Sequence, residues 1–285
     1  MFLYLLVIPM LGILKRNLVE AYHSRALNAR YRHYFIMQNR TLSELAERNT
    51  VVFCDEPFML IAVFPHPPAG WIHFATNDLE FFKNNFWEAI KLIKHSLTSI
   101  GIRLLRVGFR EISEHEYLKI FYDLGFEVYE RIPIMEKSDF ETPQHMCGDI
   151  DIRRATMEDI GDILKIDESN YPPEHRYAPE DLRRLTHNPM FFVATHKKCV
   201  VGYLFLGLHG DTGQIVRIAV RPRYQTTCVG ERLLAFGVEK LFGLGAKKIF
   251  ARTLEEPRYE MNLLRKFGFK HVDTQISLEV GLSGS

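Results

Sequence analysis

The sequence predicts an α/β protein with mixed α+β sheets, built from two similar domains in tandem. Strand-like apolar runs alternate with amphipathic helices along both halves of the chain. The first half also recurs in the second: Gly101 and Gly125 bracket a strand and a helix 24 residues apart, and Gly245 and Gly268 bracket the same pair 23 residues apart. Each half is therefore expected to form a central, mostly antiparallel sheet flanked by helices. The alternative is a pair of generic strand–helix units with no common origin.

Length and composition support two globular domains. A chain of 285 residues with 47% hydrophobic and 25% charged residues can bury a core in each half. The polar, breaker-rich stretch 136–148 predicts the linker, so we place the first domain at 1–140 and the second at 149–285. The net charge of +1 disfavours a nucleic-acid partner.

The elements of the first half follow from apolar periodicity and from residues that open helices. Thr41 and Ser43 are suited to the start of a helix. Helices are expected over 18–35, 41–48, 86–101 and 114–126, and strands over 51–55, 57–65, 70–78, 102–109 and 127–135.

The second half opens with a strand over 151–156, after which Thr156 caps a helix over 157–167. The acidic residues Glu158 and Asp159 suit the first turn of that helix. The remaining helices are expected over 180–188, 231–245 and 257–267, and the remaining strands over 191–196, 199–209, 215–220, 247–254 and 270–280.

Cysteine spacing and the N-terminal segment indicate a cytoplasmic protein. The four cysteines (Cys54, Cys147, Cys199 and Cys228) are scattered, so neither a metal site nor a disulfide framework is expected. The apolar opening, residues 1–14, is shorter than the roughly 20 residues that span a bilayer. We expect a core strand or docking segment there and no membrane partner; the alternatives are a membrane anchor or a wrongly assigned start.

The clearest functional signal lies in residues 215–230. The strand ends at Pro222, which lacks an N–H group and fixes φ. The polar turn 225–230 then presents backbone N–H groups at the start of a helix. Orphan amides and the positive end of the helix dipole both favour an anion, so a pyrophosphate is the expected ligand.

From about residue 150 to 280 the sequence resembles the GNAT family of N-acetyltransferases, in the order of its elements and in this turn. The family pattern at the acetyl-CoA pyrophosphate is Arg or Gln, two residues, Gly, one residue, then Gly or Ala. Here residues 225–230 read Gln-Thr-Thr-Cys-Val-Gly, with Cys228 in place of the first glycine. The stretches 218–222 and 266–269 also agree with the family.

The resemblance implies acetyl-CoA as the cosubstrate. It places the pantetheine arm along Ile218, Ala219 and Val220, and the pyrophosphate on Gln225, Thr226, Thr227, Cys228, Val229 and Gly230. Gly230 lacks a Cβ, so the backbone can approach phosphate oxygens closely. Cys228 is compatible with the turn if its φ stays negative. It is expected to fill space, with a redox or acyl-carrying role as the alternative.

For catalysis, the resemblance implies direct attack of an amine on the thioester, which needs a base and an acid for the leaving thiolate. Family members often have an acidic residue at the position of Gln214 and a tyrosine at that of Leu264. Relatives that acetylate protein N-termini often have a glutamate at the position of Arg252. The candidates in this chain are Tyr259 as the acid, Gln214, and Glu255, Glu256 or Asp211 as the base. Packing or helix capping is the alternative role for Tyr259.

The first half resembles the same family more faintly, over about 51–135. At the place of the phosphate turn, residues 75–82 contain no glycine and carry Asp78 and Glu80. Repulsion between these carboxylates and a pyrophosphate disfavours CoA binding, so we expect a degenerate domain.

The function that follows is that of an acetyl-CoA-dependent N-acetyltransferase working through its second half. The acceptor is expected to be a protein N-terminus or a small amine, and the segment 166–173 favours the first. A non-catalytic CoA-binding sensor or scaffold module is the alternative. A homodimer is compatible with the sequence.

Overall fold

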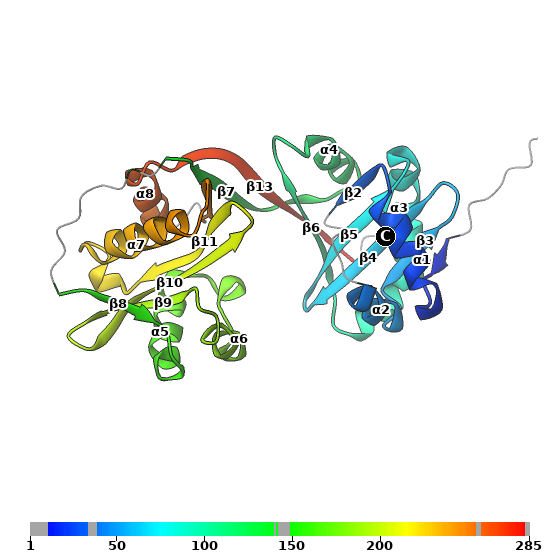
Figure 1. Cartoon of the computed structure of the whole chain (residues 1–285). Helices are drawn as coiled ribbons and strands as arrows, with labels where there is room; N and C mark the ends of the chain where they lie inside the picture. The colour runs from blue at the N-terminus through cyan, green and yellow to red at the C-terminus, as the bar shows by residue number, and fades with distance from the viewer. Residues whose placement is uncertain (1–10, 34–38, 140, 142–148, 255–257, 283–285) are drawn as a thin grey trace, which may run out of the picture. The chain divides into compact units, whose positions relative to one another are not determined.

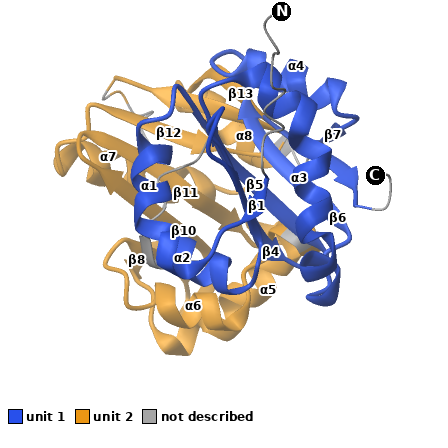
Figure 2. Ribbon diagram, turned by 90° about the vertical axis from the view of Figure 1, so that its right-hand side faces the viewer, with its two compact units in different colours: residues 1–130, 276–285 blue, residues 131–275 orange. Residues whose placement is uncertain are grey.

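The computed structural model describes residues 11–33, 39–139, 141, 149–254 and 258–282. The chain divides into two compact units (Figure 2). Unit 1 comprises Met1–Glu130 together with Ile276–Ser285, and unit 2 comprises Arg131–Gln275. These bounds differ from the domains expected at 1–140 and 149–285, because the last strand of each half of the sequence contributes to the other unit.

Unit 1 contains a mixed sheet (Figure 1). Its strands in spatial order are β1 (Gly12–Ile13), β3 (Val51–Cys54), β4 (Met59–His66), β5 (Ala69–Thr76), β6 (Leu104–Arg110) and β13 (Lys270–Gly281), of which residues 276–281 belong to unit 1. The pairs from β1 to β5 are antiparallel, and β5 pairs with β6 in parallel. The described part of the apolar N-terminal segment is thus a strand followed by the buried Leu14, whereas residues 1–10 lie outside the described residues.

Helices cover both faces of the sheet in unit 1. The helices α1 (Val19–Leu27) and α2 (Asn39–Glu47) pack on one face, and α3 (Leu79–Ser99) and α4 (His115–Asp123) pack on the other. The second face is rich in phenylalanine: the rings of Phe74, Phe82, Phe86 and Phe121 contact one another there.

The helix expected over 18–35 is wrong beyond Leu27. Residues Tyr31–His33 form the strand β2, which pairs antiparallel with β5 through Tyr31↔Thr76, Arg32↔Ala75 and His33↔Phe74. Pairing with an open sheet edge satisfies the backbone groups of this segment and overrides its helical periodicity.

Unit 2 contains the second mixed sheet. Its strands in spatial order are β7 (Glu127–Lys137, from Arg131 onward), β12 (Lys248–Arg252), β11 (Thr212–Val220), β10 (Cys199–His209), β9 (Phe191–His196) and β8 (Asp151–Arg154). Only β11 and β12 pair in parallel among these described strands. The strand β7 runs to Lys137, so the expected linker region begins inside the sheet.

Helices also cover both faces of the sheet in unit 2. The helices α5 (Ile160–Asn170) and α6 (Pro179–Leu185) pack on one face, and α7 (Val229–Gly243) and α8 (Arg258–Lys266) pack on the other. Thr156 caps a short 3-10 turn (Met157–Asp159) before α5, and the Asp159 side chain accepts a 2.8 Å hydrogen bond from the Thr156 N–H group. The expected fold class, two tandem units with mixed sheets flanked by helices, is confirmed.

A helix that crosses a bilayer needs about 20 mostly apolar residues, and this requirement can be checked for the described helices. None of them combines the length and the apolar character needed to cross a membrane.

Candidate functional site in unit 2

Strands β11 and β12 separate part-way along their length. Their parallel pairing runs from Thr212↔Lys248 to Ile215↔Ala251 and stops there, while β11 continues to Val220 on its other edge against β10. The separation begins at Val216, where β11 has one more residue than β10 between the pairs Leu206↔Ile215 and Phe205↔Arg217. Such a bulge bends a strand. Residues 216–220 therefore lie at an edge that β12 no longer covers.

The edge is lined by polar side chains from the end of α5 and from the turn before α7. The Tyr171 hydroxyl donates a 3.0 Å hydrogen bond to the carbonyl oxygen of Ile218. The Asn170 and Gln225 amides donate to the carbonyl oxygen of Val220, at 3.1 Å and 3.3 Å. Because the N–H and C=O groups of one residue in a strand point to the same side, the Ile218 and Val220 amides lie along this edge too.

Helix α7 begins beside this edge, at the predicted phosphate turn. Its N-cap residue, Cys228, has φ −76° and makes no side-chain hydrogen bond to the first turn. The negative φ explains why a side chain replaces glycine here without backbone strain. The expectation of no disulfide is wrong for Cys228, which is disulfide-bonded, whereas Cys54 and Cys199 are free thiols.

The requirement for glycine at position 230 has a cause that the sequence did not reveal. A Cβ on Gly230 would lie 2.0 Å from the Tyr259 hydroxyl oxygen and 3.2 Å from a methyl carbon of Leu263. Helix α8 therefore packs directly on the first turn of α7, and the Tyr259 hydroxyl occupies the space that a side chain at 230 would need.

In unit 1 the corresponding places are filled by the chain itself. Strands β5 and β6 also separate, after Trp71↔Arg106, but β2 pairs with the exposed edge of β5 at Phe74, Ala75 and Thr76. At the start of α3, the Asp78 carboxylate accepts a 2.9 Å hydrogen bond from the Phe81 N–H group. Unit 1 thus has a strand where unit 2 has an open edge, and a carboxylate where unit 2 has the phosphate turn.

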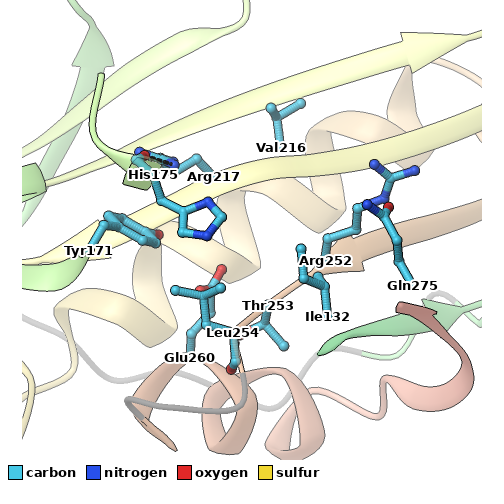
Figure 3. Close-up of a pocket in the computed structure, with 10 residues that line it drawn as sticks. All are labelled: Ile132, Tyr171, His175, Val216, Arg217, Arg252, Thr253, Leu254, Glu260 and Gln275. Carbon is cyan, nitrogen blue, oxygen red and sulfur yellow. Dashed lines mark hydrogen bonds between the residues drawn. The ribbon is translucent and has the colours of Figure 1, made fainter. Parts of the chain in front are cut away.

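A cavity of about 150 Å³ lies where β11 and β12 separate (Figure 3). Its polar lining comes from the α5–α6 connection, both strands, α8 and β13: Tyr171, His175, Arg217, Arg252, Glu260 and Gln275. A second, smaller cavity of about 10 Å³ is lined by Tyr259, Ile218 and Asn170. Tyr171, Leu254 and Glu260 line both, so the two cavities are neighbours.

Glu260 is the acidic residue of this cavity. It lies on α8 and points its carboxylate into the cavity (Figure 3). Burial raises the pKa of Glu260 to about 7, while a hydrogen bond from Thr253 and the charge of Arg217 partly oppose that rise. A carboxylate with a pKa near neutrality can accept a proton at physiological pH.

A buried ion pair fixes the opposite wall. Arg217 on β11 donates a 2.7 Å hydrogen bond to the carboxylate of Asp167, which also accepts from the Tyr203 hydroxyl and the Tyr177 N–H group. The guanidinium carbon lies 4.0 Å and 4.2 Å from the ring centres of Tyr171 and Tyr177. Asp167 is 1% exposed, so its buried charge needs the opposite charge of Arg217. The contact of the paired guanidinium with the Tyr171 ring then helps to hold that ring in place.

The structure separates the predicted catalytic residues. Tyr259 lies between the phosphate turn and Glu260, and burial, helped by the charges of Glu231 and Glu260, raises its pKa to about 12. Gln214 lines neither cavity; its side chain lies over β10 near Gly207. Asp211 is exposed in the β10–β11 turn, where it pairs with Lys247 at 3.1 Å. Glu255 and Glu256 lie outside the described residues.

The residues that sequence reasoning missed are Glu260, the Asp167–Arg217 pair, and Asn170 with Tyr171 at the strand edge. Asn170 and Tyr171 belong to the segment 166–173, which favours a protein N-terminus as the acceptor in sequence. No signal in the sequence singled out Glu260 from the neighbouring acidic residues, because its pKa depends on burial by segments distant in the chain.

Known proteins resemble both the domain that holds this site and the chain as a whole. The sequence model of the acetyltransferase (GNAT) family matches residues 157–269. A tandem GNAT protein from the clavulanic acid biosynthesis pathway has a TM-score of 0.66 at 10% identity, covering 97% of this chain and 99% of that chain. A GCN5-related N-acetyltransferase from Sphaerobacter thermophilus has a TM-score of 0.61 at 12% identity, with 96% and 95% covered.

A GCN5-related N-acetyltransferase from Kribbella flavida has a TM-score of 0.56 at 11% identity, covering 95% of this chain and 96% of that chain. No protein with a curated description matches the sequence. At these identities the structural likeness shows the fold, while the family match covers the domain that holds the strand separation and the phosphate turn. Unit 2 is therefore an acetyltransferase domain of the GNAT family, and the chain as a whole has the fold of a tandem GNAT protein.

Proposed function

We propose that unit 2 transfers an acetyl group from acetyl-CoA to an amine. One observation carries this proposal: the open edge of β11 meets the start of α7, and the equivalent edge of unit 1 is already occupied by β2. A thioester cosubstrate needs such a pairing edge for its amides and an anion site for its phosphates. Unit 2 offers both together.

The cosubstrate fits the residues assigned to it in the sequence. The pantetheine arm runs along Ile218, Ala219 and Val220, and the pyrophosphate lies on the turn Gln225–Gly230. Tyr171 and Asn170 hold the edge by their hydrogen bonds to carbonyl oxygens. The acetyl end then reaches the two neighbouring cavities, where Tyr259 and Glu260 lie.

The residues of the cavity supply the proton transfers of a direct attack. Glu260 is the proposed base in preference to Asp211, because its carboxylate lies in the cavity and its pKa is near 7. The other two candidates, Glu255 and Glu256, lie outside the described residues. The amine nitrogen forms a bond to the thioester carbonyl carbon, Glu260 takes the amine proton, and the carbon–sulfur bond breaks. Tyr259 is protonated at neutral pH and donates a proton to the leaving thiolate as the carbon–sulfur bond breaks, and the tyrosine then regains a proton from solvent.

Binding and turnover are tested in sequence. Isothermal titration should show one acetyl-CoA bound per chain, and a thiol-release assay on amines and peptides should show acceptor-dependent release of CoA. The matched variants are Glu260→Gln, which removes the proposed base, and Glu239→Gln on α7, which makes the same change outside the cavity. We expect binding in both variants and a loss of release in the first alone.

Two results would contradict the proposal. No binding of acetyl-CoA would remove the cosubstrate. Binding with no acceptor-dependent release across the panel would favour a CoA-binding sensor or scaffold module.

A further inference from the structure

Arg252 stands out among the charged groups of the larger cavity. It ends β12, just past the point where β11 and β12 part, and its side chain is exposed. Within the part of the chain that the structure describes, its guanidinium has no ion-pair or hydrogen-bond partner. The other arginine of the cavity, Arg217, is paired with the buried Asp167.

The remaining groups of the cavity do not neutralise Arg252. In Figure 3, Arg252 and Gln275 lie at one end of the cavity view, and Glu260, Tyr171 and His175 lie toward the other. An anion bound at the first end can accept hydrogen bonds from a guanidinium fork and from the Gln275 amide. An amine at the second end faces a carboxylate.

We propose that the acceptor of this acetyltransferase is a small amine that carries a carboxylate, such as a free amino acid, with Arg252 binding the carboxylate. This inference rests on the proposed function. A small acceptor also suits a cavity of about 150 Å³. An amine without an anionic group would leave Arg252 without a counter-charge beside the bound acceptor, and so would most protein N-termini.

The test compares amino acids with their own amides as acceptors. The two members of each pair differ in the carboxylate, and rates are corrected for the fraction of each amine that is unprotonated. We expect the free acids to have the higher kcat/KM, by about tenfold or more, because a charge-assisted bidentate contact is lost in the amides.

Variants assign the preference to Arg252. Arg252→Gln should raise KM for the acids by about tenfold with little change in kcat, and should leave the amides within about twofold, since the contact is made in the ground state. Arg252→Lys should retain part of the preference, because it keeps the charge but loses the fork. The matched control is Arg265→Gln on α8, an exposed arginine outside both cavities.

The outcomes separate this inference from the proposed function. If the amides are acetylated as well as the acids, or if Arg252→Gln weakens both alike, the carboxylate assignment is overturned while the acetyltransferase stands. If acetyl-CoA binds but neither the acids nor the amides are acetylated, the carboxylate assignment is overturned; the acetyltransferase fails as well only when the panel of other amines and peptides also gives no release of CoA.

Discussion

At the scale of single residues, Glu260 links the electrostatics of unit 2 to its proposed chemistry. Its pKa is raised to about 7 chiefly by burial, and the charge of Arg217 only partly offsets this because Asp167 already pairs with that arginine. A residue that holds its proton near neutrality costs stability whenever it is ionised. The same environment that makes Glu260 a suitable base therefore makes it unfavourable for folding at high pH.

The first prediction concerns Glu260→Gln. The wild-type kcat/KM should fall as pH drops through about 7, because protonation of Glu260 removes the proposed base, and the variant should lose roughly 10²- to 10⁴-fold in rate. Between the unfolded pKa of about 4.3 and the folded value of about 7, the folded state binds more protons, so stability falls as pH rises. The variant lacks this fall and should melt at an equal or higher temperature at pH 8.

The pH–rate profile and thermal melts at several pH values check both parts. A variant that loses activity and also melts well below the wild type at pH 8 would show a structural role in place of the proposed catalytic one.

The second prediction tests the contact between Gly230 and Tyr259. Gly230→Ala should destabilise unit 2 by about 1–3 kcal/mol, because the new Cβ meets the Tyr259 hydroxyl at 2.0 Å. Tyr259→Phe removes that oxygen, so the double variant should recover most of the loss; alanine is also the better helix former, by about 1 kcal/mol. Denaturant unfolding of the two single variants and the double variant measures the coupling.

An equal cost of Gly230→Ala in the tyrosine and phenylalanine backgrounds would show that the hydroxyl is not the obstacle. The obstacle would then be the ring of residue 259 and the Leu263 side chain, whose carbon atoms lie 3.1 Å and 3.2 Å from that Cβ.

At the scale of elements, the two units differ in what occupies a strand separation that both possess. In unit 2, β11 leaves β12 after Ile215 and its edge stays open; in unit 1, β5 leaves β6 after Trp71 and β2 pairs with the edge. The start of α3 likewise has its own carboxylate cap, whereas α7 has none from Cys228. Unit 1 thereby fills with a strand and a carboxylate of its own the places where unit 2, among the described residues, has only side-chain hydrogen bonds to the Ile218 and Val220 carbonyl oxygens.

The third prediction follows from that cap. Asp78→Ala should destabilise unit 1 by about 1 kcal/mol, because the Phe81 N–H group loses its acceptor, and should leave acetyl-CoA affinity and the stoichiometry of one per chain unchanged. Asp123→Ala is the matched control: its 2.6 Å pair with Lys83 is exposed and is worth about 0–1 kcal/mol.

Urea unfolding and isothermal titration measure the two effects. A second binding event in either variant, or a clear loss of affinity in Asp78→Ala, would identify unit 1 as a ligand site after all.

At the scale of the whole molecule, each unit contains a strand segment that follows or precedes the rest of that unit in the other half of the sequence. Residues 131–137 of β7 pair with β12 in unit 2, where Ile134 and Met135 are buried. Residues 276–281 of β13 belong to unit 1, where Ile276 and Leu278 join the core. Each unit therefore needs a strand from the far half of the sequence.

The fourth prediction is that fragments cut at the predicted linker do not fold. The fragment 149–285 lacks the β7 segment and 1–140 lacks the end of β13, so each loses a strand with buried side chains. The fragment 131–275 contains all of unit 2 and should unfold cooperatively. Near-UV circular dichroism and thermal melts distinguish the fragments. If 149–285 melted cooperatively at the same temperature as 131–275, the β7 segment would not be needed for unit 2 to fold, and the prediction would be wrong.

Much of the fold and half of the site could be predicted from local sequence. The repeat, the alternation of strands and helices, Pro222 at the end of a strand and the turn before α7 are properties of neighbouring residues, and they are the basis on which the cosubstrate segments are proposed. The base could not be predicted, because Glu260 is one of several glutamates in this stretch of the sequence and its raised pKa comes from burial by segments distant in the chain.

Interactions between neighbouring residues and contacts between residues far apart in the chain determined different features of this protein. Periodicity and turn chemistry act over a few residues, so the chain itself dictates a tandem of mixed sheets and a turn at 225–230 that leads into a helix. Contacts between residues far apart decide that Tyr31–His33 is a strand in the edge of β5, that β7 and β13 complete the opposite units, and that Arg252 and Glu260 face one cavity. Those outcomes depend on which strand edges lack a hydrogen-bonded neighbour and which charged side chains lack a partner once the sheets have formed. Only the tertiary structure determines both.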